Sequence, residues 1–333
     1  MQRLVEVKKR MRAIEDIRNV ARTMATVAAA KLSRTRARAS GMRIYAGRMR
    51  RILRRQQRYL ESMGLQIDRV SPFFVERPVR SVLLVLLAGD RGMCGNYNMA
   101  VNHLAFEAIS NWREKGIAVK AAARGAKAEQ YLRRKAGDLE LLRRDTWPRA
   151  GVTDTIVDEL HELATEAFTD GTADEVWCAY TRFYTPIRRE PTLVRLLPIA
   201  FTEASGPEPG DEDAGGAGDP RLDRWAYEPR FSAIGCEMVS TFVRLQCEDV
   251  LLESYASEQG ARMITMEEAT ERAGKKLHEC RATFNRLRRE FITTDLLSVL
   301  FASHVRKREE AQARHERAER SQRDGDRAGQ RPI

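Results

Sequence analysis

The chain has 333 residues, a formal net charge of +11 and 32% charged residues. It holds no apolar run of about 18 residues, so a transmembrane helix is not expected. The basic amino terminus lacks the apolar core of a secretion signal, and the five cysteines have neither CxxC nor metal-site spacing. We therefore expect a cytoplasmic chain with reduced thiols, no metal and no cofactor.

Residues 1–59 are the first predicted element, a long helix without proline. Apolar residues recur there at spacings of three and four, which indicates a coiled-coil seam. The predicted seam is Leu4, Val7, Met11, Ile14, Ile17, Ala21, Met24 and Ala28, continued by Met42, Tyr45, Met49 and Ile52. Only three acidic residues accompany many arginines in residues 1–60, so this helix favours an acidic partner.

The middle of the chain begins after the prolines of residues 71–78. Residues 81–88, SVLLVLLA, read as a strand buried on both faces, and an amphipathic helix is predicted over residues 99–115. The turn between them, residues 89–98, is rich in glycine, which suggests a phosphate site. However, it lacks both the GxGxxG spacing and the Lys-Ser or Lys-Thr that ends a Walker loop. We interpret it as a conformationally demanding turn.

Strands and helices alternate through the rest of the middle. Strands are predicted at residues 117–123, 175–182 and 192–198, and helices at residues 126–135 and 153–168. This alternation predicts an open, Rossmann-like α/β sheet. Residues 203–219 are rich in Gly, Pro, Asp and Glu, which predicts a disordered loop.

Residues 230–331 again lack proline and predict a second long helix. Its predicted seam is Met238, Phe242, Leu245, Leu252, Ala256, Met263, Met266, Thr270, Ala273, Leu277, Cys280, Phe284, Leu287 and Phe291. Asp249 and Gln259 interrupt this seam. Because both long helices join the same middle body, we expect them to form an antiparallel coiled coil.

The predicted fold class is α/β, with two long terminal helices in an antiparallel coiled coil and a central α/β domain. The predicted parts are an N-terminal helix (1–70), a central domain (71–229, with a flexible loop at 203–224), a C-terminal helix (230–304) and a charged extension (305–333).

Residues suited to covalent catalysis do not group along the sequence. The five histidines are scattered, and none pairs visibly with a serine, a cysteine or a carboxylate. Cys94, in the glycine-rich turn, is the best candidate nucleophile by position, but no histidine is near it in sequence. We therefore predict no catalytic, cofactor-binding or metal-binding residues.

Three segments carry a resemblance to a known family. They read VKKRMRAI…VARTMATVAAAKL in residues 7–32, AGDRGMCGNYN in residues 88–98 and LLESYASEQGARMITMEEAT in residues 251–270. Together, and in this order, they resemble the gamma subunit of F-type ATP synthases. The resemblance covers residues 1 to about 303, with further matches at residues 196–198, 227–229 and 291–293.

The resemblance implies a central rotor shaft that is not itself an enzyme. One copy per complex would enter the ring of alpha and beta subunits, while its globular foot, with the epsilon subunit, would sit on the c-ring. The shaft would couple ion flow to ATP synthesis or hydrolysis. It would lie at the cytoplasmic face of the bacterial inner membrane as a peripheral protein, touching the membrane only through the c-ring and binding no nucleic acid.

The family's contact with the beta subunit maps onto Met24, Arg262, Arg289 and Thr293 of this sequence. Two departures stand out. The family commonly has glutamine at the position of Arg289, and it usually ends near Ser303, whereas this chain continues. These differences favour a divergent bacterial branch, such as the N-type ATPases.

Two other interpretations stay open at this stage. A basic coiled-coil adaptor for nucleic acid or an anionic membrane would explain the charge, but not the glycine-rich turn or SEQGARM. An enzyme with a nucleotide site in the α/β middle would explain the turn, and it predicts saturable nucleotide binding by the isolated chain.

Overall fold

The computed structural model describes residues 2–62, 71–199 and 231–328. The chain divides into two compact units, one of Met1–Val20 with Ala269–Ile333 and the other of Ala21–Glu268. The long helices α1 (Gln2–Ser62) and α5 (Phe231–Ala328) each contribute to both units. The domain boundaries expected at residues 70, 229 and 304 therefore stay a prediction, and the loop expected at 203–224 lies outside the described residues.

The larger unit contains a five-stranded sheet in the order β3-β2-β1-β4-β5. The strands are β1 (Ser81–Leu87), β2 (Ala118–Arg124), β3 (Glu140–Asp145), β4 (Glu175–Phe183) and β5 (Arg189–Leu197). The first four are parallel to one another, and β5 pairs antiparallel with β4. The prediction that the continuous apolar run forms a buried strand is confirmed, because six residues of β1 are buried. This strand is the central one, with β2 and β4 on either side.

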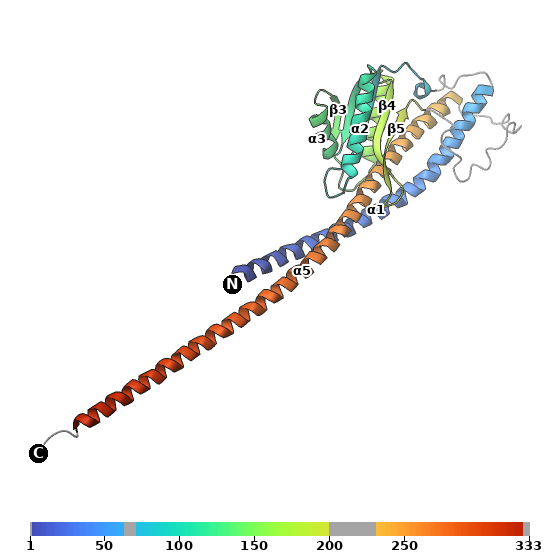
Figure 1. Ribbon diagram of the computed structural model, residues 1–333. Coiled ribbons are helices and arrows are strands. Elements are labelled where there is room, and N and C mark those ends of the chain that lie inside the picture. Colours follow the sequence, from blue (N-terminus) through green and yellow to red (C-terminus); the bar gives the residue numbers. More distant parts are fainter. Residues whose placement is uncertain (1, 63–70, 200–230, 329–333) are drawn as a thin grey trace. The chain divides into compact units, whose positions relative to one another are not determined.

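Helices cover both faces of the sheet. Leu84 and Leu86 of β1 pack with α2 (Tyr97–Glu114) and α3 (Ala126–Lys135), whereas Leu83, Val85 and Leu87 face a second core. That second core is formed by α4 (Asp154–Thr169), by α5 and by the later part of α1. The helices of the first face, α2 and α3, can be followed in Figure 1. The alternation of side chains along β1 thus assembles a three-layer α/β/α body.

Two short elements were not predicted. The edge strand β3 has the sequence ELLRRD, and its residues are only half-buried or exposed, so it carries no buried apolar run. The 3-10 helix η2 (Pro72–Phe74) precedes the sheet, and Ser71 caps it by accepting a bond from the Phe73 amide. At the opposite edge, β5 starts three residues before the predicted strand.

The seam of α1 agrees with the prediction in part: Ala21, Ala28, Met42 and Met49 are buried as expected, and other residues join them. Its buried positions recur at spacings of three and four from Ala21 to Met42, and after a step of seven the seam continues: Ala21, Ala25, Ala28, Leu32, Thr35, Ala39, Met42, Met49 and Leu53. Ile17, Tyr45 and Ile52, which were predicted in the seam, are exposed. The residue one place later is more buried in each case: Arg18 and Ala46 are half-buried and Leu53 is buried, because the helix keeps its periodicity whatever side chain stands at a position.

Helix α5 is antiparallel to α1 in the larger unit, because Leu32 clusters with Ala256 while Arg38 bonds to Glu248 further back along α5. Every residue from 250 to 261 is buried there, so α5 is a core helix in this stretch and presents more than one seam. In the smaller unit Ala273 and Leu277 are buried. Phe291, predicted as the last seam residue, is 38% exposed.

Candidate partner-contact site around the glycine-rich turn

The glycine-rich turn links the ends of three parallel strands. The Asp90 carboxylate accepts hydrogen bonds from the backbone amides of Ala126 at 3.0 Å and Trp147 at 2.9 Å. The Trp147 indole Nε1 donates to the carbonyl of Ala88 at 2.6 Å. These bonds connect the residues that follow β1, β2 and β3, so they restrain the turn in one conformation.

The same turn packs directly against α5. A Cβ at Gly89 would lie 2.8 Å from Oε1 of Glu258, so a larger residue would collide with a buried carboxylate. Gly95 has a φ of +58°, and a Cβ there would lie 3.2 Å from Oγ1 of Thr265. Glycine is therefore required at one position by close approach and at the other by the left-handed backbone.

A buried tyrosine joins the turn to α5. The Tyr97 hydroxyl lies 2.8 Å from Oγ of Ser254 and donates to the Ser254 carbonyl at 3.1 Å. Burial raises the pKa of Tyr97 well above its usual value, so the hydroxyl stays protonated as a donor. Tyr97, Cys94 and Ala261 form one small buried cluster. The two segments that carried most of the resemblance, far apart in sequence, are thus in contact.

Arg262 is engaged within the chain. Its Nη2 donates to Oε1 of Glu258 at 2.5 Å, and the two side chains are 12% and 6% exposed. Burial raises the pKa of Glu258, although Arg262 opposes this shift. The ion pair therefore holds a buried carboxylate beside Gly89. This role of Glu258 was not predicted from the sequence, although a glutamate four residues before an arginine on a helix indicates an ion pair.

The hairpin between β4 and β5 also packs against this part of α5. Phe183 clusters with Leu32 of α1 and Ala256 of α5, and the Arg36 guanidinium lies 5.7 Å from the Phe183 ring centroid. A Cβ at Gly260 would lie 3.2 Å from the Phe183 ring. The hairpin thus contacts both long helices, and the turn contacts α5.

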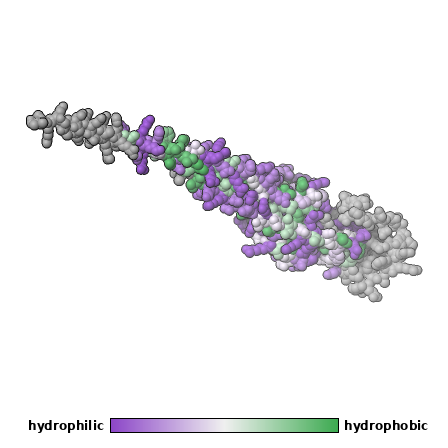
Figure 2. Space-filling model, turned by 90° about the horizontal axis from the view of Figure 1, so that it is seen from below, coloured by the Kyte–Doolittle hydropathy of each residue, from purple (hydrophilic) through white to green (hydrophobic). Residues whose placement is uncertain are grey.

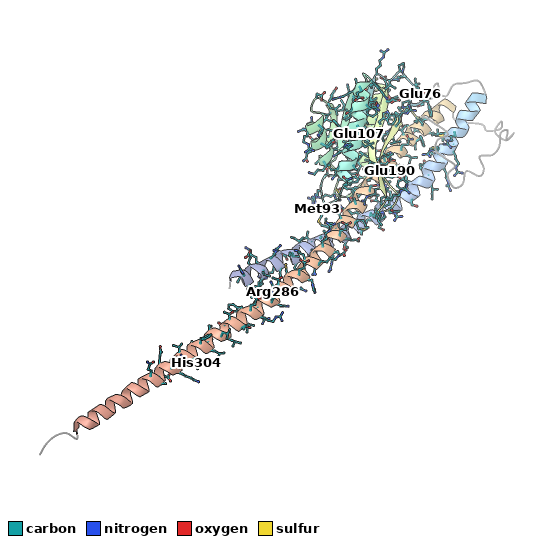
Figure 3. The ribbon with its side chains drawn as sticks, viewed as in Figure 1. Glu76, Met93, Glu107, Glu190, Arg286 and His304 are labelled. Atoms are coloured by element: carbon teal, nitrogen blue, oxygen red, sulfur yellow. The ribbon has the colours of Figure 1, made fainter. Side chains whose placement is uncertain are left out.

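Apolar and basic side chains are exposed on the turn and the hairpin. Met93 is 62% exposed and Ile187 is 84% exposed. Figure 3 labels Met93 at the turn. Tyr184 carries two arginine guanidinium groups near its ring, Arg182 at 5.9 Å and Arg188 at 4.8 Å. We call Met93, Arg182, Tyr184, Ile187 and Arg188 the turn–hairpin surface; its chemistry suits an acidic partner that also offers apolar contacts.

The four residues predicted to contact a partner are divided between the two units. Met24 is half-buried on α1 and lies, like Arg262, in the larger unit. Arg289 and Thr293 are exposed on the part of α5 that belongs to the smaller unit. The partner contacts of all four residues stay a prediction.

The carboxyl edge of the parallel strands is where open α/β sheets usually bind nucleotides. Here α5 fills that edge: the Tyr255 ring lies 5.6 Å from the Trp147 ring, and Glu258 occupies the space beside Gly89. This packing argues against the nucleotide-enzyme interpretation. Within residues 2–62, 71–199 and 231–328, no group of three His, Cys, Asp or Glu residues could hold a metal ion. None of the described helices is long and apolar enough to cross a membrane.

Comparison with known sequences places most of the chain in one family. The family described as ATP synthase matches residues 3–302. The ATP synthase gamma chain of Moorella thermoacetica is 30% identical over 303 residues, which are 90% of this chain and 98% of the relative. The ATP synthase gamma chain of Chlorobaculum parvum is 32% identical over 310 residues, covering 90% and 97%.

Solved structures share the fold. The central stalk and c-ring structure of the Tetrahymena thermophila mitochondrial ATP synthase contains a chain with a TM-score of 0.54 and 21% identity, covering 75% of this chain and 99% of that one. A chain in the Euglena gracilis mitochondrial ATP synthase has a TM-score of 0.56 and 15% identity, covering 91% and 94%. At these identities the likeness speaks for the architecture alone.

Proposed function

This chain belongs to the ATP synthase gamma chains, and from that membership we propose that it is the central rotor shaft of an F-type ATP synthase or ATPase. One copy couples ion flow through a c-ring to ATP synthesis or hydrolysis in a hexamer of alpha and beta subunits. The chain itself is not catalytic. The observation that carries the proposal is the contact between the glycine-rich turn and residues 254–265 of α5, because it gives a structural reason for both segments of the resemblance.

The physical demands on a coupling shaft suit this chain. Such a shaft must bind different catalytic states with different affinity, since equal affinity would shift no equilibrium. It must also rotate without being held at any one angle. Exposed ion pairs meet this demand, because each contributes only about 0–1 kcal/mol. The basic and apolar turn–hairpin surface supports a contact with acidic beta-subunit loops, and we assign Met24, Arg262, Arg289 and Thr293 to the same coupling contacts.

An apolar band on α5 supports insertion into a ring of subunits. The exposed apolar residues of this stretch are Phe291, Ile292, Leu296, Leu297, Val299, Leu300, Phe301 and Val305. Figure 2 shows a green band on the helix, next to hydrophilic residues. Apolar surface of this extent is normally covered by a partner. We assign it to the interior of the alpha–beta ring.

The foot of the rotor is assigned to the sheet-containing body. In the proposed complex it contacts the epsilon subunit and the c-ring, and it holds the chain at the cytoplasmic face of the bacterial inner membrane as a peripheral protein. The membrane contact is indirect, through the c-ring.

Co-expression with the alpha and beta subunits of the same genome tests the proposal. We expect one copy of this chain per three alpha–beta pairs, and an ATPase turnover that falls when Met24→Ala and Arg262→Gln are combined. A matched control is Arg34→Gln, which changes an exposed residue of α1. If the chain never co-purifies, the rotor proposal is wrong. Salt-sensitive binding to random duplex DNA at physiological salt would then favour the basic adaptor.

A further inference from the structure

Arg38 of α1 bonds to two other elements at once. Its Nε donates to Oε1 of Glu248 on α5 at 2.7 Å. Its Nη1 donates to the carbonyl of Val152 at 2.9 Å, and its Nη2 donates to Oδ1 of Asp154 at 2.6 Å. Asp154 begins α4 and Val152 lies just before it. A single guanidinium therefore connects α1, α5 and the start of α4.

A second arginine extends the connection between α5 and α4. Arg244 Nε bonds to Oδ1 of Asp158 at 2.7 Å, and its Nη1 lies 3.9 Å from Oε2 of Glu248. Asp154 and Asp158 are one helical turn apart on α4, so they share a face. We call Arg38, Arg244, Glu248, Asp154 and Asp158 the three-helix clamp.

The clamp is partly shielded from water. The Glu248 side chain is 10% exposed and the Arg38 side chain is 36% exposed. Burial lowers the pKa of Arg38, but its hydrogen bonds and charge interactions with Glu248 and Asp154 outweigh this and raise it overall. Arg38 therefore stays charged over the working range of pH.

The neighbouring contacts of α1 are of a different kind. Ala39 and Met42, which follow Arg38, face the core with a small side chain and an unbranched one. Contacts between such side chains are non-directional and resist rotation of a helix about its axis only weakly. A planar guanidinium with three acceptors has a defined direction for each bond, which fixes both the rotation and the axial position of the helix that carries it.

We propose that Arg38 is a positioning residue that fixes the rotational register of α1 against α5 and α4. Torque on the helix pair then reaches the sheet with little rotation of α1 relative to the other two helices. The inference rests on the proposed rotor function. It assigns to the three-helix clamp a share of the stiffness of this joint that is similar to the share of the apolar contacts. Glu248 is the shared acceptor between the two arginines.

The test uses the assembled complex with the hexamer fixed to a surface through tagged beta subunits. A rotation probe is attached through Glu107→Cys, an exposed position on α2 (Figure 3), with Cys236 and Cys280 replaced by Ser. The angular variance of the probe is recorded while the enzyme pauses at limiting ATP. If the clamp and the apolar contacts act as parallel restraints of similar stiffness, Arg38→Gln raises the variance about twofold.

Three variants separate positioning from general stability. Arg38→Lys retains the charge and one ion pair but loses the planar fork, so it is expected to recover only part of the stiffness. Arg34→Gln, a change of an exposed arginine on the same helix, should leave the variance unchanged. Asp154→Asn removes the charge of one exposed ion-pair partner of Arg38, so it should raise the variance less than Arg38→Gln does. Steady ATPase turnover of each assembled variant is expected to stay at the wild-type value, since the clamp acts on stiffness and not on chemistry.

The outcomes separate this inference from the proposed function. A wild-type complex that assembles and rotates, with unchanged variance in Arg38→Gln, would overturn the clamp and leave the rotor intact. A wild-type complex that neither assembles nor rotates would overturn both. If Arg38→Gln prevents assembly, Asp154→Asn decides, because loss of an exposed carboxylate should not unfold the chain; unchanged variance in that variant would overturn the clamp.

Discussion

A buried charge held by a neighbouring charge is the most consequential pair of residues in the candidate site. Glu258 is 4% exposed and depends on Arg262 one helical turn away. An isolated carboxylate at such a position is costly, because the protein interior solvates charge poorly. The family resemblance predicts that Arg262 contacts another subunit, and this stays a prediction; its bond to Glu258 gives the residue a role inside the chain.

Arg262→Gln should destabilise the assembled chain by about 3 kcal/mol, because it leaves the Glu258 carboxylate buried without its partner. Thermal unfolding of the complex measures this. The double variant Arg262→Gln with Glu258→Gln should recover most of the loss, since no buried charge then remains. Equal destabilisation in the single and double variants would contradict the explanation.

The same pair predicts a pH dependence. The pKa of Glu258 is raised in the folded chain, so folding binds its proton more tightly, and stability from this group is lost as pH rises above its usual value of 4.5. Removing Arg262 raises the cost of the ionised form further. Arg262→Gln should therefore lose less stability at pH 5 than at pH 8, measured as the shift in melting temperature against the wild type.

Cysteine reactivity gives a second test at the residue scale. Burial raises the pKa of Cys247 to about 12, and it also raises the pKa of Cys178 and of Cys94. Because only the thiolate reacts, iodoacetamide at pH 8 should label the half-buried Cys280 in preference to these three. Peptide mass spectrometry of the native and the urea-unfolded chain measures the difference. Rapid labelling of Cys178 or Cys247 in the native chain would show that the second core opens.

The residues of the candidate site were only partly accessible from the sequence. Arg262 and the glycine-rich turn could be identified because both lie in segments that resemble the family. The bond between Asp90 and the amide of Trp147 could not, because 57 residues separate the two and neither has a local signal. The prediction for Ile17 and Tyr45 is wrong for a related reason: an apolar side chain suggests burial, whereas the phase of the helix decides which positions face inward.

At the scale of elements, the alanines of α1 form a narrow contact surface. Ala21, Ala25 and Ala28 lie at successive seam positions, and Ala28 is only 1% exposed. Small residues let two helices approach closely, so there is no room for an added side chain. This explains how a helix with few large apolar residues can still be held in place.

Ala28→Leu is therefore expected to destabilise the complex by about 1–3 kcal/mol through overpacking. Val27→Leu is the matched control, because Val27 is 50% exposed and a larger side chain there meets solvent. The melting temperature should fall for the first variant and stay near the wild-type value for the second. A similar fall in both would mean that the effect does not come from overpacking of the seam.

The elements that the sequence predicted well are those with a strong local pattern. The run of β1, the turn after it and helix α3 were all placed within a few residues, because burial on both faces and helical periodicity are visible in the sequence. The edge strand β3 was missed because it is held by pairing with β2, which is a property of the partner strand. The antiparallel direction of β5 follows from its short connection to β4, which a list of apolar runs does not encode.

At the scale of the whole molecule, the end of the chain departs most from its relatives. The family match ends at residue 302, yet α5 continues to Ala328. The change in surface character falls close to the same point, because the large apolar residues of α5 end at Val305 and a largely charged stretch follows. The described side chains from 304 to 312 are all exposed, and Arg306 pairs with Glu310 along the same helix.

A helix whose surface is charged on all sides needs no partner to stay soluble, and it has no apolar surface with which a partner could make contact. Truncation after Ser303 should therefore leave assembly with the alpha and beta subunits intact and turnover unchanged. Truncation before Phe291 should instead weaken assembly, because it removes the apolar band that we assign to the interior of the ring. Co-purification yield and ATPase turnover of the two truncated chains, compared side by side, measure this. If the chain truncated after Ser303 fails to assemble, the charged extension is itself a binding element. The part of the chain needed for assembly would then extend beyond Ser303.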